Sequence, residues 1–308
     1  MLIASAPERV NVLGNPTDAL EGAVTKAVIP AAGLGTRLLP TTKELPKEMM
    51  PIFTKSRRGL TVKPILQIIF EELFDVGIRK FCFIVGRGKR AIEDHFTPDY
   101  DYVDYLMKRG KKLVAEELKD FYRKIEKSII MWVNQPEPKG FGDAVLKAKA
   151  FVGNDPFIVH AGDTLVLPEE GPRIERLVKV FTERKLDAIF LLKRVKDPRM
   201  YGVIEPGEVQ EDIVKVKKIV KKPEIPPSDL AVIPIYVFNP IIFKALETIP
   251  KGKRGELELT DAIQRIIEWG YKVNALTPRE GQEWLDVGTP NTYWRALKLS
   301  YEAVKREI

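Results

Sequence analysis

Short apolar runs alternate with segments of helical periodicity over most of this chain. The runs bounded by turn residues predict strands at 26–30, 80–85, 129–133, 156–160 and 187–192. Apolar residues spaced three and four apart predict a helix at about 63–76 and helices that start near Phe141 and Arg173. Strands that alternate with helices in this way are typical of parallel strands joined by crossover helices.

Two regions depart from this alternation. Residues 100–127 are rich in charge but keep a helical period, which predicts an inserted helical hairpin that turns near Gly110. After Arg194, strand-like runs with short turns predict an appended, partly antiparallel region. These runs are 201–205, 213–220 and 230–238, and they are followed by helices at about 258–269 and 289–305 with a strand at 272–275 between them.

The fold class predicted by these patterns is α/β. We expect a doubly wound, Rossmann-like domain around a mixed, mostly parallel central sheet. In such sheets the ligand lies in the crevice at the carboxyl ends of the strands.

Composition excludes several classes of protein. With 308 residues, 44% of them hydrophobic, the chain can bury a sizeable core and is neither disordered nor collagen-like. The longest apolar stretch, 231–238, contains Pro234 and is too short to span a membrane. The start of the sequence lacks the basic and apolar pattern of a signal peptide. We therefore expect a cytoplasmic protein without a membrane partner.

The cysteine and histidine content bears on metal sites. Cys82 is the single cysteine, so an intrachain disulfide and a cysteine-based zinc site are excluded. Two histidines, His95 and His160, do not make a metal cluster. We expect His95 at a helix end and His160 in a buried strand.

The net charge suits an anionic partner. Lys and Arg number 50 against 43 Asp and Glu, a formal charge of +7. These charges are spread along the chain, and the basic runs 87–90, 108–112 and 215–222 are most simply solvated faces. No basic stripe is interleaved with aromatic residues, so we expect a polyphosphate substrate rather than nucleic acid. The 30% of charged residues is also typical of thermophiles.

The densest chemical pattern follows the first strand. Residues 31–51 read AAGLGTRLLPTTKELPKEMMP. Gly33 and Gly35 let backbone N–H groups approach a phosphate without an intervening Cβ. Leu38 stands where a dinucleotide fingerprint needs a third glycine, and no Walker A sequence occurs in the chain. Cations held among prolines favour a loop that grips a triphosphate; these cations are Arg37, Lys43 and Lys47.

This stretch resembles the signature of the sugar-1-phosphate nucleotidylyltransferases, and in particular of the bacterial-type UTP–glucose-1-phosphate uridylyltransferases. That pattern, G-x-G-T-R-x-x-P-x-T-K-x-x-P-K-E-M-x-P, is matched at each specified position from Gly33 to Pro51. Further stretches are similar to family motifs in the same order: 86–96, 135–144, 259–263 and 286–290. The resemblance covers about residues 25–300 and implies a nucleotidyltransferase fold of the glycosyltransferase-A-like type.

The reaction implied by the resemblance is uridylyl transfer from UTP to glucose 1-phosphate, which gives UDP-glucose and pyrophosphate. The sugar phosphate attacks the α-phosphorus in line. No general base is required, because the attacking phosphate is already ionised at neutral pH. Catalysis is then charge neutralisation and the alignment of two anions.

The resemblance also implies roles for individual residues. Arg37 and Lys47 are assigned to the leaving pyrophosphate, and Mg²⁺ to Asp163 and Asp286, each at a strand end. The residues assigned to the nucleotide are Ala32, Gly33, Gly35, Thr36, Gln135 and Gly140. An amide at Gln135 can read the uracil edge, but thymine presents nearly the same edge, so dTTP stays open as an alternative.

The sugar side departs from the family at one position. The family has a Glu-Lys-Pro segment whose lysine binds the incoming phosphate, which corresponds to Lys222, while Gly202 corresponds to a glycine that faces the sugar. The glutamate that usually contacts sugar hydroxyls is replaced by Lys221, which cannot accept a hydrogen bond. Either Glu224 or another acceptor replaces it, or the sugar carries a carboxylate that pairs with Lys221.

The domain organisation predicted is an extension at 1–24 followed by one nucleotidyltransferase domain at 25–308, with the helical insertion at about 98–128. The extension resembles the start of galactokinase-type kinases, but no glycine- and serine-rich ATP loop follows, so a second catalytic activity is not expected. A hairpin packed on the domain or an oligomer contact is the simpler role. We expect a homo-oligomer, a dimer or a tetramer; a catalytically silent nucleotide-sugar sensor is the alternative function.

Overall fold

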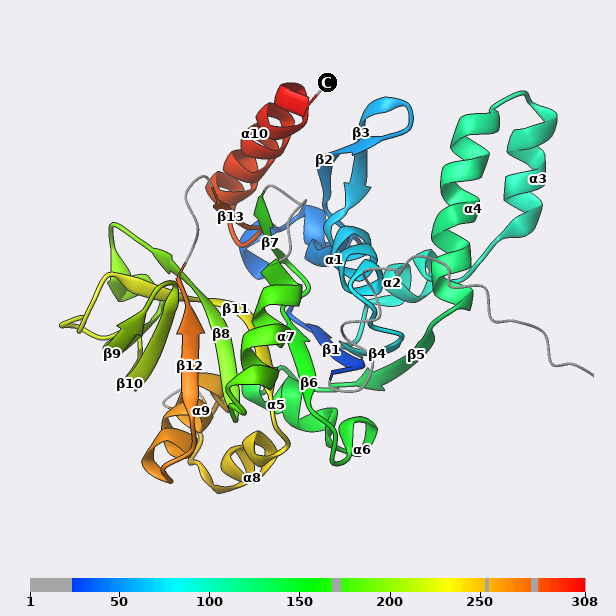
Figure 1. The fold of residues 1–308 in the computed structure, drawn as a ribbon. Coiled ribbons are helices and arrows are strands. Elements are labelled where there is room, and N and C mark those ends of the chain that lie inside the picture. The colour runs from blue at the N-terminus through cyan, green and yellow to red at the C-terminus, as the bar shows by residue number, and fades with distance from the viewer. Residues whose placement is uncertain (1–23, 168–172, 253–254, 278–281, 308) are drawn as a thin grey trace, which may run out of the picture.

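A nine-stranded mixed sheet runs through the molecule, with helices on both faces (Figure 1). The computed structural model describes residues 24–167, 173–252, 255–277 and 282–307. The strand order is β5-β4-β1-β6-β11-β8-β12-β10-β9. The bounds are β1 (Lys26–Ala31), β4 (Lys80–Val85), β5 (Ile129–Asn134), β6 (Phe157–His160), β8 (Ala188–Arg194), β9 (Gly202–Gln210), β10 (Ile213–Lys221), β11 (Leu230–Phe238) and β12 (Val273–Leu276).

The predicted α/β fold with a mostly parallel sheet is confirmed. Strands β5, β4, β1 and β6 pair in parallel, and within the sheet β10 and β11 run against the other strands. The chain leaves β1 toward β4 and β5 and returns to β6 on the other side of β1. The crevice between the carboxyl ends of β1 and β6 is therefore the topological switch point, where α/β sheets bind ligands.

The prediction that 230–238 belongs to an appended region is wrong. This strand, β11, lies inside the sheet between β6 and β8. Pro234 is tolerated in a central strand because the pairing with β8 is irregular between Ile233 and Tyr236, where no ladder hydrogen bond from residue 234 is needed. The Pro234 carbonyl accepts a hydrogen bond from the amide of Ala161 at 3.0 Å.

Alternation along the strands builds two cores, one on each face of the sheet. In β1, Ala27 and Ile29 belong to one apolar cluster, whereas Val28 belongs to the other. The first cluster is covered by α1 (Ile65–Asp75), α4 (Lys112–Glu126) and α7 (Arg173–Glu183). The second is covered by α5 (Phe141–Lys147), α8 (Ile241–Thr248) and α9 (Leu259–Glu268). Residues on both faces are fully buried, which makes the sheet the rigid support of the site.

Two small sheets were not predicted from the sequence. One is a hairpin of β2 (Pro51–Ser56) and β3 (Gly59–Pro64), and the other pairs β7 (Thr164–Leu167) with β13 (Glu283–Asp286). Because Lys63 and Pro64 belong to β3, α1 begins at Ile65 rather than at 63. The remaining helices are α2 (Arg90–His95), α3 (Tyr100–Lys108), α6 (Lys149–Val152) and α10 (Pro290–Glu307).

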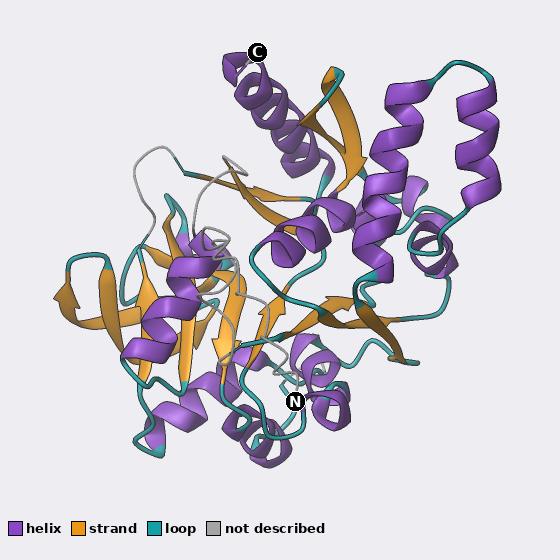
Figure 2. Ribbon diagram, turned by 45° about the vertical axis from the view of Figure 1, so that its right-hand side comes forward, coloured by secondary structure: helices purple, strands orange, loops and turns teal. Residues whose placement is uncertain are grey.

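Helices α3 and α4 form a hairpin that projects from the body of the molecule (Figures 1 and 2). The carboxylate of Asp99 accepts a hydrogen bond from the amide of Tyr102 at 2.9 Å and caps α3. Gly110 takes a φ of 75° at the turn, where the sequence predicts it. Of the extension predicted at 1–24, residues 1–23 lie outside the described part of the chain.

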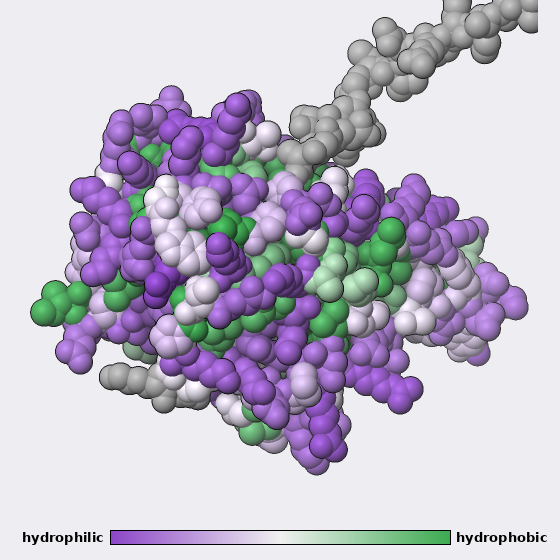
Figure 3. Space-filling view, turned by 90° about the horizontal axis from the view of Figure 1, so that it is seen from below, coloured by the Kyte–Doolittle hydropathy of each residue, from purple (hydrophilic) through white to green (hydrophobic). Residues whose placement is uncertain are grey.

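Figure 3 shows the surface from below, where α6, α8 and α9 lie in Figure 1. This face is mostly hydrophilic, with hydrophobic residues gathered near its middle. In the described part of the chain, no helix combines the length and the apolar character needed to cross a membrane.

Candidate active site

A cavity of about 590 Å³ opens at the switch point, between the carboxyl ends of β1 and β6. The predicted cations Arg37 and Lys47 and the predicted carboxylates Asp163 and Asp286 all line it. So do the residues predicted to bind the nucleotide, namely Ala32, Gly33, Gly35, Thr36, Gln135 and Gly140. The fold thus brings together, at one place, segments that are more than two hundred residues apart in the sequence. We call this space the nucleotide cavity.

The loop after β1 is shaped by its glycines. Gly35 adopts a left-handed conformation, φ 65° and ψ 20°, and begins a short 3₁₀ turn at Thr36–Leu38. Its carbonyl accepts a hydrogen bond from the hydroxyl of Thr42 at 2.8 Å, which closes the loop. A Cβ at Gly33 would lie 3.3 Å from Cε of Lys47. The lysine side chain therefore passes directly along the glycine backbone.

Lys47 is held by carboxylates. Its ammonium donates a hydrogen bond to Oδ2 of Asp163. Burial alone would lower the pKa of Lys47, but the carboxylates of Asp163, Glu48 and Asp286 outweigh it and raise the pKa above its usual value. Lys47 is therefore a permanent cation in the cavity.

The two aspartates are held next to each other by backbone contacts. Asp286 ends β13 and pairs with Thr164, the first residue of β7, while the amide of Val287 donates to the carbonyl of Asp163 at 3.2 Å. Gly288 leaves room for the carboxylate of Asp286, because a Cβ there would lie 2.7 Å from Oδ2. Burial and the neighbouring carboxylate of Asp163 raise the pKa of Asp286 to about 6.

These carboxylates fit a divalent cation. Burial and the carboxylate of Asp163 raise the pKa of Asp286, which indicates a site where positive charge is favoured. Among the described residues, no histidine, cysteine or further acidic side chain joins these two carboxylates as a third member of a metal-binding group. A set of two carboxylates suits Mg²⁺, which commonly takes its other ligands from water and substrate phosphates. The donor set does not suit zinc, which prefers nitrogen and sulfur ligands.

Glu48, the residue after Lys47, belongs to a buried ion pair. Glu48 is 1% exposed and accepts a hydrogen bond from the ammonium of Lys89, which is 7% exposed, at 2.7 Å. Burial raises the pKa of Glu48, and the ammonium groups of Lys89 and Lys47 act against that rise. The pair connects the loop after β4 to the lysine-bearing turn. Sequence analysis gave neither residue a role in this site.

The loop after β5 presents an amide to the cavity. Nε2 of Gln135 donates to Oδ2 of Asp143 at 2.7 Å and to the carbonyl of Gly140 at 3.2 Å. Both donors of the amide are thus used, and its oxygen is the group left to face the cavity. Gly140 has a φ of 101°, and a Cβ there would lie 2.6 Å from the carbonyl of Leu257. Only glycine therefore allows this loop to pack on the segment before α9.

The three predicted sugar-side residues are not in the lining of this cavity. Gly202 begins β9 and pairs in register with Lys221, the last residue of β10. The amide of Lys222 donates to the carbonyl of Tyr201 at 2.8 Å, while its side chain is exposed. The ammonium of Lys221 is bonded to the carboxylate of Glu258. These residues form a separate cluster, connected to the site through Tyr201.

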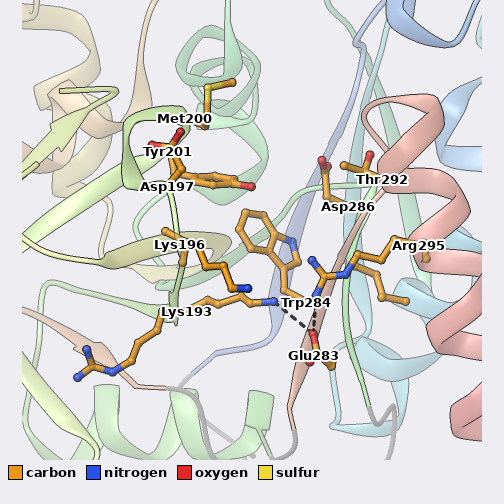
Figure 4. A pocket seen from close by; sticks show the side chains of 14 residues that line it. Lys193, Lys196, Asp197, Met200, Tyr201, Glu283, Trp284, Asp286, Thr292 and Arg295 are labelled. Carbon is orange, nitrogen blue, oxygen red and sulfur yellow. Dashed lines mark hydrogen bonds and ion pairs between the residues drawn. The ribbon is translucent and has the colours of Figure 1, made fainter. Parts of the chain in front are cut away.

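A second cavity, of about 560 Å³, shares two residues with the first one, and its lining is drawn in Figure 4. Trp284 and Asp286 line both cavities, and the rings of Tyr201 and Trp284 lie 5.3 Å apart. Lys193 and Arg295 converge on the carboxylate of Glu283, at 3.4 Å and 3.0 Å (Figure 4). The second cavity is thus lined by cations and by aromatic rings, and no residue of the phosphate loop lines it.

Sequence reasoning missed several residues of this site. Trp284 is two residues before Asp286 in a strand that alternates, so its position on the same side as the aspartate was a usable signal. Thr164 follows Asp163 directly and was equally readable. Pro234 lines the cavity only because β11 enters the sheet beside β6, which no local pattern indicates.

Known proteins resemble this chain in sequence and in fold. Residues 26–302 match the family model described as nucleotidyl transferase. The chain is 37% identical over 249 residues to a putative UTP–glucose-1-phosphate uridylyltransferase of Methanocaldococcus jannaschii, covering 80% of this chain and 83% of that protein. It is 40% identical over 249 residues to the UTP–glucose-1-phosphate uridylyltransferase of Bacillus subtilis, covering 80% and 81%. A solved UDP-glucose pyrophosphorylase complexed with UDP-glucose superposes with a TM-score of 0.77 at 31% identity, covering 91% of this chain and 99% of that one.

Proposed function

The chain belongs to the nucleotidyl transferase family, and we propose that it transfers the uridylyl group of UTP to glucose 1-phosphate, with UDP-glucose and pyrophosphate as products. The observation that carries this proposal is the nucleotide cavity. It gathers a glycine-rich loop, two cations, two carboxylates and an amide that faces inward. Relatives of about 40% identity bear the same activity in their names.

The reaction needs charge and alignment rather than a base. An oxygen of the sugar phosphate attacks the α-phosphorus of UTP, a P–O bond to that oxygen forms, and the P–O bond to the β-phosphate breaks with its electrons leaving on pyrophosphate. Arg37 and Lys47 line the cavity beside the glycine loop and offset the charge of the leaving pyrophosphate. The loop's backbone N–H groups orient the same phosphates.

Magnesium is part of the proposal. Asp163 and Asp286 would hold the ion, which supplies positive charge to the phosphate oxygens when bound. The ammonium of Lys47 neutralises Asp163 while the nucleotide is absent. When substrate is present, the same ammonium can donate its hydrogen bond to a phosphate oxygen instead of Asp163.

The base and sugar sides complete the assignment. The oxygen of Gln135 accepts the N3–H of uracil, with its amide nitrogen fixed by Asp143 and Gly140. We assign the incoming phosphate to Lys222 and the sugar face to Gly202. The glucose then approaches from the side of Tyr201, where the second cavity opens beside Asp286.

The first test is product analysis by mass spectrometry. The protein is incubated with Mg²⁺, glucose 1-phosphate and an equimolar mixture of UTP, dTTP, ATP, CTP and GTP. The expected products are UDP-glucose and pyrophosphate, with dTDP-glucose as the minor product if base choice is loose. Absence of any nucleotide-sugar, with UTP still bound, would support the silent sensor instead.

The metal assignment has its own test. Asp163→Asn and Asp286→Asn are expected to lower kcat on the order of 10²-fold or more, since each removes charge aimed at the reacting phosphates. Binding of Mn²⁺ in the presence of UTP, followed by electron paramagnetic resonance, should weaken in both variants. Asp155→Asn, which removes an exposed carboxylate paired with Lys26, is the matched control and should change neither quantity. Unchanged Mn²⁺ binding in the two site variants would contradict the assignment.

A further inference from the structure

Lys221 is the residue at which this chain departs from the pattern of its family, and the structure shows what neutralises it. Its ammonium donates a hydrogen bond to Oε1 of Glu258, 37 residues later in the sequence. The side chain of Lys221 is 35% exposed and that of Glu258 is 16% exposed, so the pair is partly shielded from water. The cation is therefore already paired with a carboxylate of its own chain. A negatively charged sugar would have to displace Glu258 to reach it.

Glu258 belongs to a segment that borders the nucleotide cavity. Glu256 lines that cavity. Leu257 is fixed on the base loop, because its amide donates to the carbonyl of Lys139 at 2.7 Å and its carbonyl accepts from the amide of Gly142 at 2.9 Å. Glu258 has an extended backbone, φ −101° and ψ 126°. Alternate side chains of an extended segment point the same way, so Glu258 shares the side of Glu256.

The other flank of the pair is the predicted sugar loop. Lys221 pairs in register with Gly202, and a Cβ on Gly202 would lie 3.1 Å from Cγ2 of Thr260, in the first turn of α9. The neighbouring Tyr201 lines the second cavity and contacts Trp284. Glu258 is thus two residues from the lining of the nucleotide cavity and, through Lys221, in contact with the strand that pairs with the loop assigned to the sugar.

We propose that Glu258 accepts the hydrogen bonds of the sugar hydroxyls, and that Lys221 is the positioning residue that holds its carboxylate in place. This inference rests on the proposed function. A carboxylate offers about four lone-pair positions on two oxygens. Lys221 uses one of them on Oε1, which leaves Oε2 and a further position on Oε1 for hydroxyl donors. The acceptor thus stands at position 258 instead of position 221, and the cation at position 221 holds it in place.

The same arrangement defines the class of sugar. Burial raises the pKa of Asp261, and the nearby carboxylate of Glu258 raises it further. Glu258 and Asp261 thus set two carboxylates around the ammonium of Lys221, while the neighbouring Lys222 is assigned to the phosphate. A neutral hexose 1-phosphate with free hydroxyls fits these two acceptors, whereas a uronic acid 1-phosphate would bring a third carboxylate beside them. The alternative in which Lys221 binds a sugar carboxylate is therefore disfavoured, and Glu224, exposed in the loop after β10, is not needed as the acceptor.

The test separates sugar from nucleotide. KM and kcat are measured for glucose 1-phosphate at saturating UTP, and for UTP at saturating glucose 1-phosphate, in Glu258→Gln, Lys221→Gln and the double variant Lys221→Glu with Glu258→Gln. Glu258→Gln is expected to raise KM for glucose 1-phosphate about tenfold or more, the loss of a charge-assisted hydrogen bond. KM for UTP should stay within about twofold of its starting value. The double variant, which returns a glutamate to position 221, should recover most of the loss.

Glu268→Gln, at the far end of the same helix, removes a carboxylate paired with Arg265 and should leave both KM values unchanged. The wild-type protein should use glucose 1-phosphate at least tenfold better than glucuronate 1-phosphate. An unchanged KM for glucose 1-phosphate in Glu258→Gln, or a preference for glucuronate 1-phosphate, would overturn the inference.

Failure of the proposed function is a different result, namely a wild-type protein that forms no UDP-glucose. In that case the inference is decided by calorimetric binding of glucose 1-phosphate in the presence of UTP. Weaker binding by Glu258→Gln alone, with recovery in the double variant, supports it. Equal binding by wild type and Glu258→Gln rejects it.

Discussion

The ammonium of Lys47 donates a hydrogen bond to the carboxylate of Asp163, 116 residues away in the sequence, inside the nucleotide cavity. The pair joins the turn that follows the phosphate loop to the strand end that carries the proposed metal ligand. Each side chain is about four-fifths buried, which strengthens the interaction relative to a surface pair. In the free protein, then, the proposed catalytic cation and the proposed metal ligand neutralise one another.

Replacement of Lys47 tests this double role. Lys47→Gln should lower kcat on the order of 10²–10³-fold, because a cation beside the leaving pyrophosphate is lost. The same variant should bind Mn²⁺ at least as tightly as wild type without nucleotide, since no ammonium competes for Asp163. Both quantities are measured on one preparation, by pyrophosphate release and by paramagnetic resonance. Lys149→Gln, at an exposed pair with Glu247, is the control. Weaker Mn²⁺ binding by Lys47→Gln would show that the lysine does not compete for the carboxylate.

The buried pair of Glu48 and Lys89 makes a prediction about stability. Glu48→Gln should lower the free energy of unfolding by about 3 kcal/mol, because Lys89 is left as a buried charge without its counter-ion. Replacement of both residues by methionine should cost less than either single replacement, since no unpaired charge remains. Urea denaturation of the single and double variants measures this coupling. Additive losses in the double variant would mean that the two side chains do not stabilise each other.

Base choice should depend on Asp143 as much as on Gln135. Asp143 accepts a hydrogen bond from Nε2 of Gln135, which leaves the amide oxygen for the cavity, where we expect it to reject the N3 acceptor of cytosine. Asp143→Asn can accept or donate, so only the carbonyl of Gly140, at 3.2 Å, still fixes the amide of Gln135, and the amide turns over more easily. The ratio of kcat/KM for UTP over CTP should fall roughly tenfold or more, whereas the ratio for UTP over dTTP should not change. Asp75→Asn is the exposed control. A constant UTP to CTP ratio would remove Asp143 from base recognition.

Buried histidines should make stability depend on pH. Burial lowers the pKa of His95 to about 4, and burial likewise lowers that of His160 to about 4. Below the unfolded value of about 6.5 the unfolded chain takes up these protons and the folded protein does not. Their contribution to stability is therefore complete above pH 6.5 and is lost as the pH falls toward 4, by about 3 kcal/mol for each histidine.

The measurement is the free energy of unfolding in urea between pH 7.5 and pH 4.5. Nε2 of His95 lies 3.0 Å from Oε1 of Gln67, so His95→Gln removes the titrating group while keeping a side chain that can donate. This variant should be less stable at pH 7.5 and should lose less stability with falling pH than wild type. Parallel pH profiles of the two proteins would mean that His95 does not titrate in this range.

The central strands and their helices could be predicted because their sequences carry one dominant signal. Runs such as 80–85, apolar at almost every position, are buried on both faces, and the flanking helices show a clear period. The hairpin of β2 and β3 was missed because its residues are half-exposed and its ends are prolines, which resemble a loop. β7 and β13 are four residues each, too short for a pattern to rise above its surroundings.

Much of the site was readable for a different reason. Glycines and cations at fixed spacing, together with the resemblance they carry, identified the residues that line the nucleotide cavity, from Gly33 to Asp286. The partners of these residues were not readable. Lys89 meets Glu48, and Glu258 meets Lys221, across 41 and 37 residues that contain no related pattern. Such pairings follow from the way strands and helices are stacked, which is a property of the whole fold.

The position of β11 also sets the order in which the molecule can be completed. The strand is synthesised after β8 but inserts between β6 and β8, and β12 follows it to the far side of β8. While the chain leaves the ribosome, β6 therefore keeps an unpaired edge until residue 238 has emerged. Pro234, Trp284 and Asp286, which come late in the sequence, also line the nucleotide cavity. A nascent chain thus carries the whole phosphate loop long before residues 234, 284 and 286 complete the wall of the cavity.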